Sequence, residues 1–247
     1  MFADLRRALG LLTVLPVRAP VSDTALPGRA MAYYPLVGAV IGGILAGIAA
    51  LLHWSGLTTS VPLLSAAIVL ALWGGLTGGL HLDGWADCCD ALFVPVDRER
   101  RLEIMKDPRL GGFGAVGLVL LLLVKFAALQ GVMGKPHALL TLVAVVAVAR
   151  LGAVVAAYAF PSARPGGMGA YFRRGLSWRG LSVSVVIALA AAAPLLWRGA
   201  VVWAAVAVAC VLFASLAEAR LGGLTGDVYG AIVELGETLA LVALCFL

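Results

Sequence analysis

Three aspartates spaced along one predicted helix are the residues of this chain best suited to chemistry. Asp83, Asp87 and Asp90 follow His81 in the run HLDGWADCCD. At about 100° per residue, positions i, i+4 and i+7 fall within roughly 60° of one another. Three carboxylates on one face repel each other, and acidic residues at membrane depth usually mark an ion or substrate site. We expect a hard divalent cation, Mg²⁺, as their partner, with Asp83 and Asp87 as its first ligands.

A second acidic face is predicted near the C-terminal end. Asp227, Glu234 and Glu237 stand at i, i+7 and i+10, again close to one face of a helix. We expect Asp227 and Glu234 to complete the metal site from this second helix. Asp90 is expected as a third ligand or as the catalytic base, and Glu237 as the base or as a support for the ligands. His81 would contact phosphate, move a proton or serve only the structure.

Four cations have positions that predict contact with an anion. Lys106 and Arg109 come just before a glycine-rich turn, where backbone amides and positive charge suit a diphosphate. Arg150 lies near the middle of a predicted span and Lys125 inside another. A single cation at that depth costs roughly 2.5–3.5 kcal/mol on insertion scales. We therefore expect Arg150 to pair with an acid or hold a substrate phosphate, and Lys125 to pair or to reach an interface.

The elements that must position these residues are transmembrane helices. Of 247 residues, 62% are hydrophobic and 13% charged, and the mean hydropathy is +1.04. A soluble domain has about 45–50% apolar and about 25% charged residues. The sequence therefore predicts an all-α, polytopic membrane bundle, with residues 1–247 as a single domain. The first 30 residues lack the features of a cleaved signal peptide.

Windows of about 20 apolar residues predict seven membrane-spanning helices. The fifth and sixth are short and nearly continuous, so that six or eight spans also fit. The predicted spans are 33–52, 62–82, 113–133, 137–160, 181–197, 199–217 and 228–247.

Lysine and arginine alternate between rich and poor loops along the chain. The N-terminal segment and the loops at 83–112 and 161–180 are rich, whereas the turns between them hold few cations. By the positive-inside rule, the N-terminus, these loops and the 218–227 loop lie in the cytoplasm. Both acidic faces then begin at the cytoplasmic leaflet and predict one shared site there. With seven spans, the C-terminus falls outside.

Three runs carry a resemblance to a known family. They are GGLHLDGWAD at 78–87, RLEIMKDPRLG at 101–111 and LGGLTGDVYGAIVELGE at 221–237. Together they resemble the cobalamin synthases, the adenosylcobinamide-GDP ribazoletransferases of the late vitamin B12 pathway. The matching pieces are spread in order from about residue 30 to the C-terminus.

The cysteines indicate packing rather than chemistry. Cys88, Cys89, Cys210 and Cys245 include no C-x-x-C pair, and we interpret them as small hydrophobes in helices. Cys88 and Cys89 stand where the family is usually more polar, and Tyr229 is a second departure, within the last run.

The resemblance implies a reaction, a cofactor and a location. The enzyme would join adenosylcobinamide-GDP to α-ribazole or its 5′-phosphate, releasing GMP and forming adenosylcobalamin or its phosphate. It would use Mg²⁺ and sit in the bacterial inner membrane, with its active site on the cytoplasmic side. The implied partners are these substrates and the lipid bilayer, with no nucleic acid; a homo-oligomer or a complex with other cobalamin-assembly enzymes stays open.

Two other functions were weighed against this resemblance. A CDP-alcohol phosphotransferase also carries spaced aspartates on membrane helices. Here, however, Asp87 stands where that family's first run has arginine, and no G-x-x-x-D-x-x-x-D follows. A secondary transporter would use buried acids and cations too. It should show inverted repeats or paired broken helices near the midplane, and the sequence predicts neither.

Overall fold

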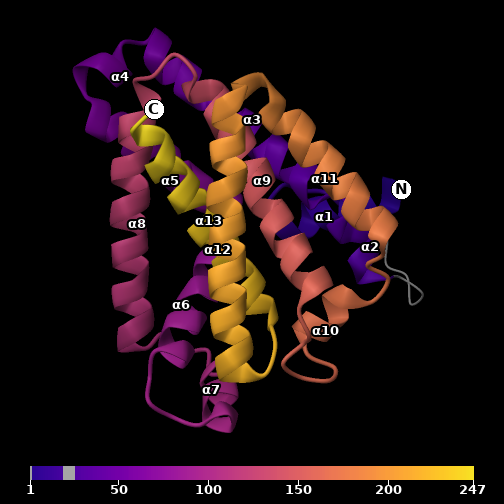
Figure 1. Cartoon of the computed structure of the whole chain (residues 1–247). Helices are drawn as coiled ribbons and strands as arrows, with labels where there is room; N and C mark the ends of the chain where they lie inside the picture. The colour runs from indigo at the N-terminus through magenta and orange to yellow at the C-terminus, as the bar shows by residue number, and fades with distance from the viewer. Residues whose placement is uncertain (1, 19–25) are drawn as a thin grey trace.

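The chain folds into a bundle of helices that run between two ends of the molecule (Figure 1). The computed structural model describes residues 2–18 and 26–247. Its helices are α1 (Phe2–Leu12), α2 (Pro27–Met31), α3 (Tyr34–Trp54), α4 (Leu57–Ser60), α5 (Pro62–Leu76), α6 (Leu80–Leu92), α7 (Arg98–Ile104), α8 (Gly112–Met133), α9 (Ala138–Ala159), α10 (Met168–Arg173), α11 (Trp178–Ala192), the 3₁₀ turn η1 (Ala193–Leu195), α12 (Trp197–Leu221) and α13 (Gly226–Cys245).

The prediction of a polytopic helical membrane protein is confirmed. In the described part of the chain, six helical segments are long and apolar enough to cross a membrane. They are α3, α8, α9, α11 with η1, α12 and α13. The bent pair of α5 and α6 brings the total to seven if it counts as one span. Six of the seven predicted spans therefore match a helix to within a few residues at each end.

The predicted continuous span at 62–82 is wrong, because the chain turns sharply inside it. Helix α5 ends at Leu76, and α6 leaves it at an angle of 88°. The two glycines at the bend, Gly78 and Gly79, have φ of +62° and +70°, in the left-handed region that favours glycine. The Thr77 hydroxyl donates to two carbonyls of the last turn of α5. The acidic run therefore occupies a separate helix of 13 residues, whereas it was expected to end the second span.

Helices α9 and α13 form the centre of the bundle. About three quarters of the most apolar stretch of each helix is buried: 78% in α9 and 72% in α13. Helix α3 lies against α9 at very short range, because Gly38 and Gly42 face its backbone. A methyl group added at either glycine would come within 2.6 Å of a carbonyl oxygen of α9. Small residues four apart commonly let membrane helices approach in this way.

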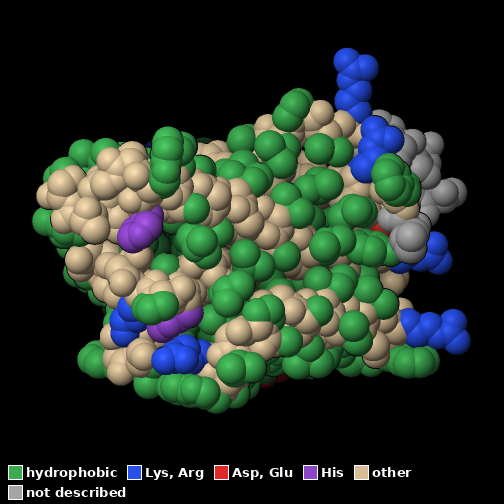
Figure 2. Space-filling model, turned by 90° about the horizontal axis from the view of Figure 1, so that it is seen from above, with side chains coloured by type: hydrophobic (Ala, Val, Ile, Leu, Met, Phe, Trp, Pro, Cys, Tyr) green, Lys and Arg blue, Asp and Glu red, His purple; other side chains and the backbone are tan. Residues whose placement is uncertain are grey.

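The outer helices present apolar side chains that a bilayer would cover. Leu120 and Leu123 on α8, Val186 on α11 and Leu212 on α12 are all more than half exposed. In Figure 2, which looks at the molecule from above, apolar side chains are spread across the face, and Lys and Arg side chains gather at its right and at its lower left. Exposed apolar side chains in such number are typical of contact with lipid.

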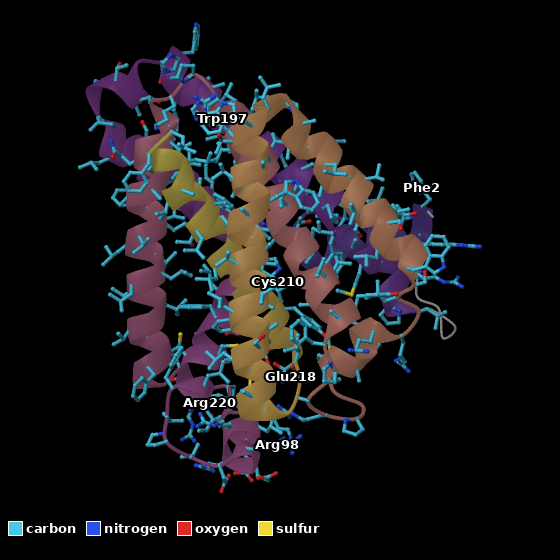
Figure 3. All side chains as sticks on the ribbon, in the orientation of Figure 1. Phe2, Arg98, Trp197, Cys210, Glu218 and Arg220 are labelled. Carbon is cyan, nitrogen blue, oxygen red and sulfur yellow. The ribbon has the colours of Figure 1, made fainter. Side chains whose placement is uncertain are left out.

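Two arginines of α7, Arg98 and Arg101, hold neighbouring segments together at one end of the bundle. Figure 3 labels Arg98 and Arg220 at this end and Trp197 at the other end. Arg98 donates to the carbonyls of Leu221 (2.7 Å) and Ala163 (2.9 Å), and so joins three loops. Arg101 is buried and donates to two carbonyls at the end of α6. Both arginines stand on α7, which is a short helix that is only partly exposed. The arginine-rich loops share this end, as the alternation of charge predicts; the side of the membrane they face stays a prediction.

Candidate active site

The candidate active site is built where α6 crosses α13. Two glycines allow the backbones to touch. A methyl group at Gly84 would lie 2.7 Å from the carbonyl oxygen of Asp227, and one at Gly230 would lie 3.2 Å from the Cα of His81. The backbone of α13 therefore fills the space beside Gly84. The crossing is antiparallel, since position 84 meets 227 while 81 meets 230.

Three aspartates meet at this crossing without an ion pair to any lysine or arginine that the structure describes. Asp83 is exposed, and Asp87 and Asp227 are half-buried. Asp83 and Asp227 are both close enough to act electrostatically on the carboxylate of Asp87. None of the three forms an ion pair with a described lysine or arginine, although Thr225 donates to Asp227 (3.2 Å). The structure therefore brings together three of the four predicted metal ligands.

The charge and chemistry of this cluster suit a hard cation. Facing carboxylates without a cation repel each other, and Mg²⁺ commonly takes one or two carboxylates plus water and substrate phosphates. Within residues 2–18 and 26–247, no three His, Cys, Asp or Glu side chains enclose an ion by themselves. Oxygens of a bound substrate would be needed to complete such a site.

A pocket of about 140 Å³ opens behind the aspartates, and we call it the inner pocket. It lies between α6, α9, α10 and α13 and is closed by the start of α3 and the end of α1. Its walls are mostly apolar. Four charged or titratable residues of the prediction line it: His81, Asp83, Asp227 and Arg150. Two tyrosines from facing helices, Tyr34 and Tyr229, complete its polar edge.

Two shallower pockets flank the aspartates on the side of the loops. One, of about 210 Å³, is lined by Lys106, Arg164 and Asp227. The other, of about 400 Å³, is lined by Asp87 and Arg109 among others. Lys106 and Arg109 are exposed, as expected for groups that receive a phosphate. Arg164 was not among the predicted site residues; its basic, glycine-rich loop was the available signal.

Arg109 is held by a neighbouring carboxylate. It donates to Asp107 from Nε (2.9 Å) and Nη2 (2.6 Å). These hydrogen bonds lower the pKa of Asp107 to about 2. The pair is therefore fully charged at neutral pH, and a phosphate must compete with Asp107 for the guanidinium of Arg109.

Asp90 serves a different purpose from the one predicted. Its two carboxylate oxygens accept hydrogen bonds from the backbone amides of Gly111 and Gly114, both at 2.8 Å. These amides begin α8 and have no partner within the helix, so Asp90 caps α8 from outside. Both oxygens are occupied, which leaves Asp90 poorly suited to act as the base or as a third ligand.

Glu234 and Glu237 also lie apart from the aspartates. Lys125 pairs with Glu234 at 2.6 Å and with Glu237, and Arg150 pairs with Glu237. All four are buried, and Lys125 lies 4.3 Å from the ring centre of Trp73. Seven residues of helix separate Glu234 from Asp227 by about 10 Å along the axis. The predicted ligand role of Glu234 and base role of Glu237 thus do not fit these positions, whereas the predicted pairing of both cations is confirmed.

The fold and the site define a polytopic helical membrane protein with an acidic, cation-flanked site at one end of its bundle. Comparison with known proteins then gives the particular family. The cobalamin-5-phosphate synthase family model matches residues 4–245, and the chain belongs to this family.

Its relatives match along nearly their whole length. An adenosylcobinamide-GDP ribazoletransferase of Pseudomonas paraeruginosa (strain PA7) is 45% identical, over 96% of this chain and 95% of the relative. The protein of the same description from Pseudomonas aeruginosa (strain PAO1) is 44% identical over the same shares. One from Roseiflexus sp. (strain RS-1) is 38% identical over 98% and 89%. No solved structure matches the chain. The resemblance is confirmed, and neither alternative function gains support.

Proposed function

We propose that this chain is an adenosylcobinamide-GDP ribazoletransferase that works with Mg²⁺ at the cytoplasmic face of the bacterial inner membrane. It would transfer the adenosylcobinamide-phosphate group to α-ribazole or its 5′-phosphate and release GMP. The observation that carries the proposal is the trio Asp83, Asp87 and Asp227. Their unpaired carboxylates lie on two crossing helices beside two pockets with cations, in a member of a family whose relatives bear this activity in their names.

In this proposal, Asp83, Asp87 and Asp227 hold the metal ion. When bound, Mg²⁺ offsets the negative charge of the diphosphate and of the leaving phosphate. Lys106 and Arg109 bind phosphate oxygens of the GDP-activated substrate from either side of the aspartates.

The chemistry is a displacement at phosphorus. The acceptor hydroxyl oxygen bonds to the cobinamide-linked phosphorus, the bond from that phosphorus to the oxygen of GMP breaks, and GMP leaves with the electron pair. His81 is our candidate to take the hydroxyl proton. It lines the inner pocket beside Asp83 and Asp227, and its Nδ1 has no hydrogen-bond partner within the described residues. A neutral imidazole suits proton transfer near neutral pH.

Release of GMP by purified protein tests the proposal. The protein in detergent micelles is mixed with adenosylcobinamide-GDP, α-ribazole and Mg²⁺, and GMP is measured over time. We expect turnover that stops when EDTA removes the metal and is lost in Asp87→Asn. Glu99→Gln is the matched control, because Glu99 is an exposed carboxylate on α7 outside all of the pockets described. Absence of GMP release from the wild-type protein with both substrates and Mg²⁺ would refute the proposal.

A further inference from the structure

One buried side chain of the inner pocket, Arg150, has donors that no described residue satisfies. Arg150 lines this pocket from the middle of α9 and is 0% exposed. Its Nη1 pairs with Glu237, but its Nε and Nη2 have no hydrogen-bond partner within the described residues. An unmet donor in a buried place is costly, and such groups usually have a partner when the protein does its work. A ligand seated in the pocket that Arg150 lines is the nearest candidate to supply the missing acceptor.

The charge around Arg150 indicates what kind of acceptor that is. Two cations, Lys125 and Arg150, pair with two carboxylates, Glu234 and Glu237, so the formal charge of the buried cluster is zero. A phosphate placed here would add charge to a balanced group in an apolar surrounding, which is unfavourable. A neutral ligand atom with a lone pair meets the free donors without that cost. The phosphate role predicted for Arg150 does not fit this position.

The walls of the pocket are suited to a flat, apolar ring. Leu12, Met31 and Ala153 line it, together with the aromatic side chains of Tyr34, Phe172 and Tyr229. Its volume is about 140 Å³. An apolar cavity of about 150 Å³ takes up one aromatic ring in a protein interior. The pocket is thus lined to receive an aromatic ring, and it is too small for a corrin ring.

We propose that the inner pocket holds the base of the acceptor nucleoside, a neutral bicyclic aromatic whose imine-type ring nitrogen accepts a hydrogen bond from Arg150. This assignment rests on the proposed function, since α-ribazole carries a benzimidazole base with one such nitrogen. The ribose then extends toward the rim of the pocket, where Asp83 and Asp227 lie. Arg150 becomes a determinant of acceptor specificity instead of a phosphate ligand.

Replacing the ring nitrogen is the direct test. Binding of the benzimidazole nucleoside and of its indole counterpart, in which CH replaces the imine nitrogen, is measured by calorimetry on the purified protein without the corrinoid. We expect the indole nucleoside to bind at least about tenfold more weakly, because the Arg150 donors then stay unmet. Equal affinity for both nucleosides, or no binding of either, would overturn the assignment. Since no turnover is needed, this result is separate from a failure of GMP release.

Changing the size of the pocket gives a second test. Val233→Ala on α13 enlarges it and Ala153→Val on α9 reduces it. We expect the larger pocket to shift the ratio of affinities toward the dimethylated base, and the smaller one toward unsubstituted benzimidazole. Val148→Ala and Ala156→Val are the matched controls, since both residues are buried in α9 and line none of the pockets described. If the pocket instead holds a lipid chain, all four variants keep the wild-type ratio, which would overturn the assignment.

Discussion

Lys125→Met tests how far one buried cation holds the centre of the bundle together. Lys125 is 2% exposed and pairs with both Glu234 and Glu237. Methionine has similar length, so the change removes the charge and leaves little empty space. Arg150 would then face two buried carboxylates alone. Removing one partner of a buried pair costs about 3–5 kcal/mol, because the remaining charge has neither water nor a partner. The lost contact with Trp73 adds about 0.5–2 kcal/mol.

The free energy of unfolding is measured by steric trapping in mild detergent. We expect Lys125→Met to lose about 3.5–7 kcal/mol, the sum of the two contributions. The double variant Lys125→Met with Glu234→Gln removes one charge of each sign and should recover at least about 1 kcal/mol of that loss. A single variant within about 1 kcal/mol of wild type would refute the reasoning. A double variant whose loss of stability equals the sum of the losses of the two single variants would also refute it, since the two residues would then not be coupled.

Three further predictions concern residues around the aspartate site: Asp90, Gly84 and Asp107. Asp90→Ala should lower the free energy of unfolding by about 1–2 kcal/mol through loss of the cap of α8, measured in the same assay. Gly84→Ala should reduce kcat for GMP release strongly, because its methyl group would displace the backbone at Asp227. Asp107→Asn should lower the KM for the GDP-activated substrate about two- to fivefold, the range of an exposed ion pair, by releasing Arg109. With the pKa of Asp107 lowered to about 2, the pair is intact above that pH, so its ionisation adds no pH dependence between pH 5 and 9.

Each of these has an outcome that would contradict it. An unchanged stability in Asp90→Ala would mean that the cap is dispensable and would reopen a catalytic role. Gly43→Ala is the control for Gly84→Ala, because a methyl group at Gly43 meets nothing within 4 Å. Equal activity in both variants would contradict the close crossing of α6 and α13. A higher KM in Asp107→Asn would mean that the carboxylate positions Arg109 for the phosphate.

Hydropathy and loop charge predicted most of the architecture, because span length and arginine placement are direct consequences of the bilayer. The spacing of the acidic residues also predicted correctly that Asp83 and Asp87 share one helix and that Asp227, on a second helix, lies close to them. The bend at Gly78 and Gly79 was the main error, since a purely apolar window does not register a change of direction. A pair of adjacent glycines was the available signal for a break.

The site was predicted less well than the fold, for reasons of depth and hydrogen bonding. Angular spacing put Glu234 on the same face as Asp227, but it ignored the rise of the helix between them. Spacing likewise did not reveal that the carboxylate of Asp90 is used by the amides that begin α8. Burial of Lys125 and Arg150 predicted that each needs a partner, yet which acid pairs with which cation depends on how α8, α9 and α13 pack.

The sharp bend between α5 and α6 has a consequence for how this protein is made. Helix α5 has 15 residues and is about 22 Å long, short of the roughly 30 Å of a bilayer core. Neither α5 nor the acidic α6 is long and apolar enough by itself to be inserted into the bilayer as a separate span. The helix that packs most extensively on α6 is α13, which begins only at Gly226 and is therefore synthesised more than 130 residues later. The site that Asp83, Asp87 and Asp227 form is therefore complete only once α13 has been made, and a nascent chain stopped before α13 would leave α6 packed on α8 without Asp227 beside it.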